Sequence, residues 1–98
     1  MSASGGGTPI RAKVTSRPDP VYPVRASRRG EEGTVRLKVQ VLPTGSVGEI
    51  EVVSTSGSPD LDKAAVECVK QQWKFTPATL DGKPAEDGVS VRIVFRRE

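Results

Sequence analysis

The 98-residue sequence contains no histidine and a single cysteine, Cys68. Without histidine, the commonest general base of enzymes and a frequent metal ligand are both missing. A lone cysteine excludes an internal disulfide and a cysteine cluster for zinc. We therefore expect a protein that is not an enzyme, with no catalytic residue, no metal site and no cofactor.

Long apolar runs and aromatic residues are also scarce. No stretch approaches the roughly 20 apolar residues that cross a bilayer, and no signal-peptide pattern is present, so the chain itself is not expected to insert into a membrane. Aromatic residues make up only 4% of the sequence and do not alternate with basic residues. A stacking platform for nucleic acid needs that alternation, so we expect no nucleic-acid partner.

The formal net charge of +3 is unevenly distributed along the chain. Residues 1–30 hold six basic side chains and one acidic side chain, whereas residues 31–98 hold nine basic and eleven acidic ones. This asymmetry is typical of a basic arm that contacts an anionic surface, or of a soluble tether. A nucleic-acid or anionic-lipid binder that uses residues 11–29 therefore stays an alternative, and a steep salt dependence of binding would reveal it.

The N-terminal third of the chain is rich in glycine, serine and proline. Residues 1–17 are predicted to be a flexible linker, or sequence added for expression. Three prolines between residues 18 and 23 favour extended geometry and predict a stiff strap. Pro23 suits the first position of a short helix, which Gly30 would end.

Two segments with alternating apolar residues predict a β-hairpin. Residues 35–41 place valine and leucine on one side of a strand and polar residues on the other. Pro43 and Gly45 supply a turn, and a second strand follows over residues 47–54.

A helix and a last strand complete the predicted elements. Ser58 and Pro59 are typical of a helix start, and an apolar stripe continues to Trp73 before Pro77 ends the helix. We expect Cys68, Trp73 and Phe75 to be core residues. The last strand, residues 88–95, points its odd-numbered side chains inward, and its outward set contains Arg92 and Val94, followed by Arg96.

These elements predict an α+β fold, a two-layer β-β-α-β sandwich with a short N-terminal helix. One main helix covers the apolar face of a three-stranded antiparallel sheet. A right-handed crossover places the last strand beside the first, in the order 2-1-3. The last strand is therefore expected to be an edge strand with one side of its backbone unpaired.

An ordered set of motifs in this chain resembles the TonB C-terminal domain family. The motifs are Tyr22-Pro23, Gly30, Gly33, Gly45-Ser46-Val47, Ser54-Thr55-Ser56-Gly57, Leu61-Asp62, Ala65, Trp73-Lys74-Phe75-Thr76-Pro77-Ala78 and Asp81-Gly82-Lys83-Pro84. The resemblance covers residues 18–98, so we expect a TonB-like domain there. It implies the same fold as the residue pattern.

The resemblance implies a non-enzymatic, periplasmic protein-interaction module of an energy transducer. Such a domain binds an extended peptide of an outer-membrane partner, the TonB box, by β-strand addition to its last strand, and transmits traction driven by the proton-motive force. It implies a periplasmic domain of an inner-membrane-anchored protein of a Gram-negative bacterium. In the full-length protein, proton-channel motor proteins of the inner membrane are the implied partners. Family members also pair or exchange strands, which leaves a homodimer open.

The resemblance also implies the partner-binding residues. The edge strand contributes Val89, Val91, Arg92, Val94 and Arg96, and the strap contributes Asp19, Val21 and Tyr22. The alternative for the edge is simple protection by Arg92 and Arg96 against aggregation, and the alternative for Tyr22 is a plug at the end of the core. An alternative for the whole domain is a TonB-like part of another envelope machine, for gliding motility or secretion, that grips a non-receptor partner.

Overall fold

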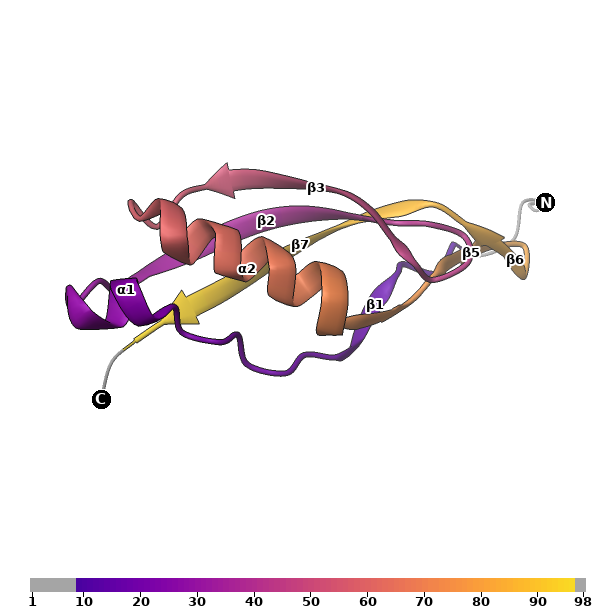
Figure 1. Ribbon diagram of the computed structural model, residues 1–98. Helices are drawn as coiled ribbons and strands as arrows, with labels where there is room; N and C mark the ends of the chain where they lie inside the picture. Colours follow the sequence, from indigo (N-terminus) through magenta and orange to yellow (C-terminus); the bar gives the residue numbers. More distant parts are fainter. Residues whose placement is uncertain (1–8, 97–98) are drawn as a thin grey trace.

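A computed structural model of the protein describes residues 9–96. The elements in chain order are β1 (Lys13–Ser16), α1 (Val24–Arg28), β2 (Gly33–Val41), β3 (Val47–Ser54), α2 (Pro59–Gln72), β4 (Lys74–Thr76), β5 (Ala78–Leu80), β6 (Lys83–Ala85) and β7 (Asp87–Phe95). Helix α2 lies across one face of the sheet formed by β3, β2 and β7 (Figure 1). No helix in the described part of the chain is long and apolar enough to cross a membrane.

The three long strands form an antiparallel sheet in the order β3-β2-β7, which confirms the predicted order. The β2–β7 register runs without interruption from Gly33 opposite Phe95 to Val41 opposite Asp87. The β2–β3 register shifts twice, once near Leu37 and once near Val41. Each shift is an irregularity that bends a strand locally and increases its twist.

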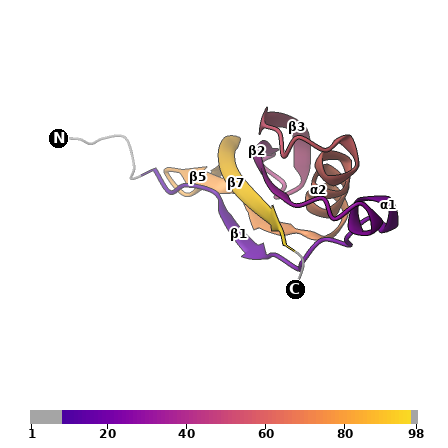
Figure 2. The same ribbon diagram turned by 90° about the vertical axis from the view of Figure 1, so that its left-hand side faces the viewer.

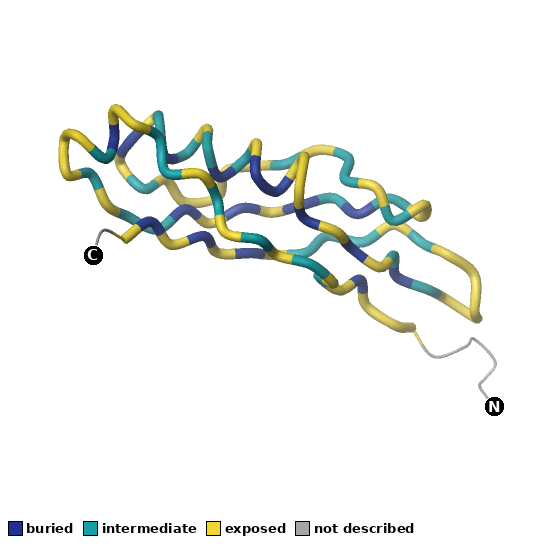
Figure 3. The backbone as a smooth tube through the Cα atoms, turned by 60° about the horizontal axis from the view of Figure 1, so that its bottom comes forward, coloured by how far each residue is buried: buried dark blue, intermediate teal, exposed yellow. Residues whose placement is uncertain are grey.

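The core lies between α2 and the inner face of the sheet. Ser58 caps the helix, and its hydroxyl accepts a hydrogen bond from the Leu61 N–H at 3.4 Å. Leu61 and Val69 on α2 are fully buried, as are the apolar residues of β2 from Val35 to Val41. Figure 3 shows the alternation of buried and exposed positions along the strands. Burial of these aliphatic side chains is the main stabilising contribution to the two-layer fold.

The loop between β3 and α2 is held by the Asp62 carboxylate. It accepts hydrogen bonds from the Ser56 N–H at 2.9 Å and the Ser56 hydroxyl at 2.7 Å, and from the Thr55 hydroxyl. Burial alone would raise the pKa of Asp62, but these hydrogen bonds outweigh burial and lower it. Gly33 lies against this loop, because a Cβ atom at that position would be 2.8 Å from the Ser56 carbonyl oxygen. The motif residues of this region therefore pack the loop onto the start of β2.

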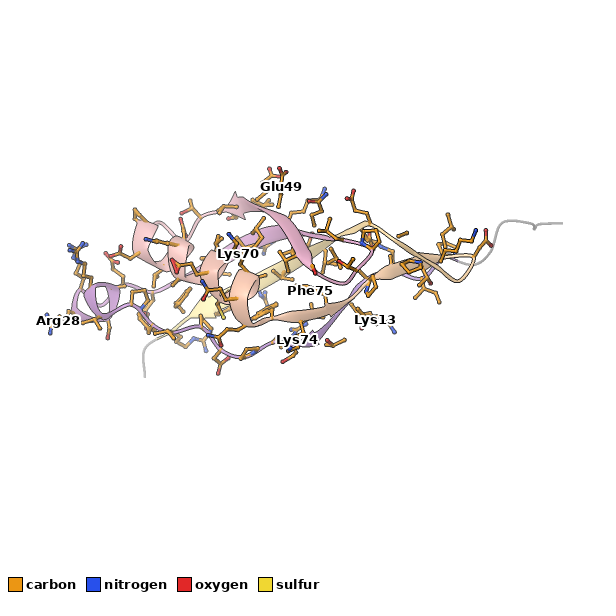
Figure 4. The ribbon with its side chains drawn as sticks, turned by 45° about the vertical axis from the view of Figure 1, so that its right-hand side comes forward. Lys13, Arg28, Glu49, Lys70, Lys74 and Phe75 are labelled. Carbon is orange, nitrogen blue, oxygen red and sulfur yellow. The ribbon has the colours of Figure 1, made fainter. Side chains whose placement is uncertain are left out.

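Part of the predicted linker is structured. Lys13–Ser16 forms β1 and pairs antiparallel with β4, and Ile10 exchanges two backbone hydrogen bonds with Thr79. Figure 4 shows Lys13 and Lys74 on these paired strands, at a distance from Arg28 on α1. The linker prediction is thus wrong for residues 10–16, and residues 1–8 lie outside the described part. The partner strand comes about 60 residues later, so no local pattern in the sequence indicates the pairing.

A short hairpin lies between Pro77 and β7. Strands β5 and β6 pair around Asp81 and Gly82. Both turn residues have a positive φ, 56° for Asp81 and 77° for Gly82. This geometry is favoured for a two-residue hairpin turn because it matches the twist of the flanking strands.

Candidate functional site

The candidate site is the open edge of β7. One edge of β7 pairs with β2, and no described strand pairs with the other edge. Figure 2 shows β7 at the side of the sheet that faces β1, with β2 and β3 beyond it. The nine residues of β7 are in continuous register with β2, so no bulge interrupts the backbone groups along this open edge.

The backbone of Gly88 shows which residues face the open edge. Its N–H donates to the Asp87 carboxylate at 2.8 Å, and its carbonyl accepts from the Arg11 guanidinium at 3.1 Å. Both groups therefore bond to partners other than β2. Because successive residues of an antiparallel strand alternate between the two edges, Ser90, Arg92 and Val94 direct their N–H and C=O groups to the open edge.

The side chains of β7 divide into two sets. Val91, Ile93 and Phe95 are buried in the core, and Val89 is half-buried against it. Arg92, Val94 and Arg96 are exposed. Of the residues predicted to bind a partner, Val89 and Val91 therefore stabilise the strand from its core face, whereas the other three offer side chains to the solvent.

The open edge of β3 is less regular than that of β7. The two register shifts lie along β3, and register shifts of this kind blunt an edge for pairing with another strand. Val53 lies at one shift and is 61% exposed. An added strand would therefore find a longer uninterrupted partner along β7 than along β3.

The strap crosses the C-terminal end of α2 before it reaches β7. The Trp73 indole N–H donates to the Pro18 carbonyl oxygen at 3.0 Å, and the Arg17 guanidinium lies 5.7 Å from the centre of a Trp73 ring. Trp73 itself is buried. The indole thus anchors the strap to the helix.

Tyr22 brings the strap to the last strand. Its ring meets that of Phe95 edge-to-face, with 5.4 Å between the centroids and 85° between the planes. Its hydroxyl donates a hydrogen bond to the Glu31 carbonyl. Tyr22 therefore plugs one end of the core, which is the alternative that the sequence left open for this residue. At the same time it lies against β7.

The other two strap residues of the predicted site lie elsewhere. Asp19 is exposed, and Val21 is 76% exposed. Val21 lines a groove of about 330 Å³ together with Ala64 and Cys68 of α2. The structure thus unites Tyr22 with the edge strand and places Val21 beside the helix.

Residues 11 and 12 contact the first residues of β7. The sequence analysis did not predict this contact. The Asp87 carboxylate accepts from the Arg11 Nε at 2.7 Å and from the Ala12 N–H at 3.0 Å. The hydrogen bond from Arg11, with that from the Ala12 N–H, lowers the pKa of Asp87 to about 2. We call Arg11, Ala12 and Asp87 the N-terminal clamp. Asp87 lies about 75 residues after Arg11 and Ala12 in the sequence, so no motif could have indicated the clamp.

Cys68 does not have the environment of a nucleophile. It lies on the buried face of α2, and burial raises the pKa of its thiol. Reactive cysteines need a lowered pKa and access to substrate. No group of three or more metal-ligating side chains occurs within residues 9–96. What the described residues do offer is an accessible strand edge.

Comparisons with known proteins agree with this architecture. The family model described as Gram-negative bacterial TonB protein C-terminal matches residues 18–96. Protein tonB2 of Pseudomonas aeruginosa is 55% identical over 81% of this chain, and Protein TonB of Vibrio cholerae is 38% identical over 89%. The chain spans 29% and 35% of the lengths of these two relatives. A solution NMR structure of the Pseudomonas aeruginosa TonB CTD is similar, with a TM-score of 0.71 and 26% identity over 89% of this chain and 87% of that one.

Proposed function

Because the chain belongs to the Gram-negative bacterial TonB protein C-terminal family, we propose that it is the receptor-binding domain of a TonB-type energy transducer. The domain binds an extended peptide of an outer-membrane receptor by strand addition to β7. The observation that carries this proposal is the uninterrupted open edge of β7, where Ser90, Arg92 and Val94 direct their backbone groups outward.

Strand addition at this edge explains both affinity and transmission of force. A peptide beside β7 would exchange neutral N–H···O=C bonds with three residues, and the exposed Arg92, Val94 and Arg96 would meet its alternate side chains. A pull along the strand direction loads these bonds in shear, so several must break together. A site built in this way sustains traction without catalytic groups.

The strap is proposed as the second contact region. Tyr22 lies against Phe95 at the C-terminal end of β7, so a peptide that pairs with the strand runs past the strap. Asp19 is an exposed acidic residue of the same strap. Its proposed role is to bias the choice of peptide toward one without an acid at the facing position.

The wider role of the protein follows from the family. We propose a periplasmic location, an anchor in the inner membrane and proton-channel motor proteins as partners of the full-length protein. The relatives described above are TonB proteins, which favours a receptor over the partner of a motility or secretion machine.

An NMR titration of the domain with peptides tests the proposal. The probes are synthetic peptides from the N-terminal periplasmic segments of outer-membrane receptors of the same cell. We expect amide shifts to concentrate on residues 88–95, with smaller shifts at Asp19 to Tyr22 and none along β3. The same peptides with proline at alternate positions are the control, because they lack the donors for a ladder. If no peptide shifts the β7 amides, or if the proline peptides act equally well, strand addition is refuted.

A further inference from the structure

We propose that the N-terminal clamp closes one end of the β7 edge and thereby sets the register in which a peptide strand adds. Arg11 is the residue at which the added strand has to end, a point that we call the register stop, and Asp87 holds the Arg11 side chain in position. The inference rests on the proposed function and deepens it, because it assigns a register-determining role to Arg11, which lies before the matched region 18–96.

The clamp already uses the backbone groups that an incoming strand would need at Gly88. The Gly88 carbonyl accepts from the Arg11 Nη2 at 3.1 Å, where a peptide N–H would otherwise bind. The Gly88 N–H donates to the Asp87 carboxylate at 2.8 Å. At this position a peptide therefore finds the N–H already bonded to Asp87 and has to compete with the Arg11 guanidinium for the carbonyl oxygen.

The clamp is held in place from both sides. On one side, the Arg11 Nε and the Ala12 N–H both donate to the Asp87 carboxylate, and Ala12 is buried. On the other side, Ile10 pairs with Thr79 by two backbone hydrogen bonds of 2.9 and 3.0 Å. The backbone pairing of Ile10 with Thr79 before Arg11, and the hydrogen bond from the Ala12 N–H to the Asp87 carboxylate after it, hold this segment at the start of β7, although the guanidinium side chain itself is 75% exposed.

The stop determines how much of the edge a peptide can use. The next residue of β7 that faces the edge is Ser90, followed by Arg92 and Val94. A paired segment of about five residues, opposite residues 90–94, uses every backbone group between the clamp and the end of β7. Residues added to the peptide beyond Ser90 would meet Arg11 and gain no hydrogen bond.

A length series with the best receptor peptide of the titration above tests this inference. Three peptides are made: one of about five residues, one with two more residues at its N-terminus and one with two more residues at its C-terminus. A nitroxide label on the peptide shows which of its ends lies near Gly88. Affinity is measured for the wild-type domain, for Arg11→Ala and for Lys13→Ala. Lys13→Ala is the matched control, because it removes one exposed positive charge from the same segment without contact to Asp87 or Gly88.

In the wild type and in Lys13→Ala, extension toward Gly88 leaves the affinity unchanged. In Arg11→Ala the same extension tightens binding by about threefold to tenfold, because the Gly88 carbonyl becomes available for one new hydrogen bond. The Gly88 amide then also shifts on binding. Asp87→Asn, which keeps the acceptor oxygen but loses the ion pair, gives an intermediate gain.

Two outcomes would overturn the inference. If the wild type gains from the extension as much as Arg11→Ala does, or if Arg11→Ala gains nothing, the clamp does not set the register, although strand addition itself stands. If no peptide of any length binds either protein, both the proposed function and the register stop are refuted.

Discussion

At the scale of single residues, Asp87 connects the N-terminal segment to the edge strand by charge. Its pKa falls from 3.8 to about 2 in the folded protein, chiefly because Arg11 donates to its carboxylate. A group whose pKa is lowered by folding stabilises the protein above its unfolded pKa, and this stabilisation is lost as the pH falls toward the folded pKa. The affected window therefore lies between about pH 4 and about pH 2.

We predict that Asp87→Asn changes the pH dependence of stability in that window. Urea unfolding of the wild type should show a free energy of unfolding that decreases from pH 4 to pH 2, and the decrease should be smaller in the variant. Asp62, whose pKa is also lowered, remains in both proteins and contributes equally to each. Parallel curves for the two proteins would contradict the assigned role of Asp87.

At the scale of elements, the two edges of β7 differ in what they bond. Odd-numbered residues such as Val91 direct their backbone N–H to β2, whereas Arg92 directs its N–H to the open edge. Proline lacks this N–H, and in sheets it is tolerated where the missing donor faces solvent. Proline substitutions at neighbouring positions of β7 should therefore have different effects, one on the stability of the domain and the other on peptide binding.

We predict that Arg92→Pro leaves the domain folded but weakens peptide binding by about tenfold or more, because one ladder hydrogen bond is lost and the ring meets the peptide. Val91→Pro breaks a bond to β2 and should unfold the domain or lower its free energy of unfolding by about 3 kcal/mol or more. Circular dichroism and peptide titration of both variants are the measurements. A folded Arg92→Pro domain with full affinity would place the peptide elsewhere.

At the scale of the whole molecule, the uneven charge separates two modes of binding. The excess of basic side chains lies in residues 1–30, whereas the open edge offers mainly neutral backbone groups. Contact with a nucleic acid or an anionic lipid surface releases counterions and weakens steeply with salt. Strand addition depends on backbone hydrogen bonds and is much less affected by screening.

We predict that the dissociation constant of a bound receptor peptide changes by less than about threefold between 50 and 200 mM salt, whereas a contact with several phosphates would weaken by orders of magnitude. Isothermal titration at the two salt concentrations measures the difference. Arg25→Ala, which removes one basic side chain from the short helix α1, is the matched control and should leave the peptide affinity unchanged. A steep salt dependence would instead favour binding through the basic N-terminal residues.

The sequence alone determined the elements whose pattern is local. Alternation along residues 35–41 and 88–95 predicted β2 and β7, and the cap at Ser58 with its apolar stripe predicted α2. These patterns are readable because burying one face of a strand or helix requires a fixed period. The order of the sheet followed from the handedness of the crossover, so the open edge that carries the proposed function could be predicted as well.

The tertiary structure alone decided the contacts between short segments far apart in the chain. The pairing of β1 with β4, the meeting of Tyr22 with Phe95 and the clamp between Arg11 and Asp87 have no periodic signal. The register shifts of β3 belong here too, and so does the 42% exposure of Val52, which lies opposite the buried Leu37. Such contacts depend on which segments the folded core brings together, because a stretch of a few residues becomes stable only when its partner is already in place.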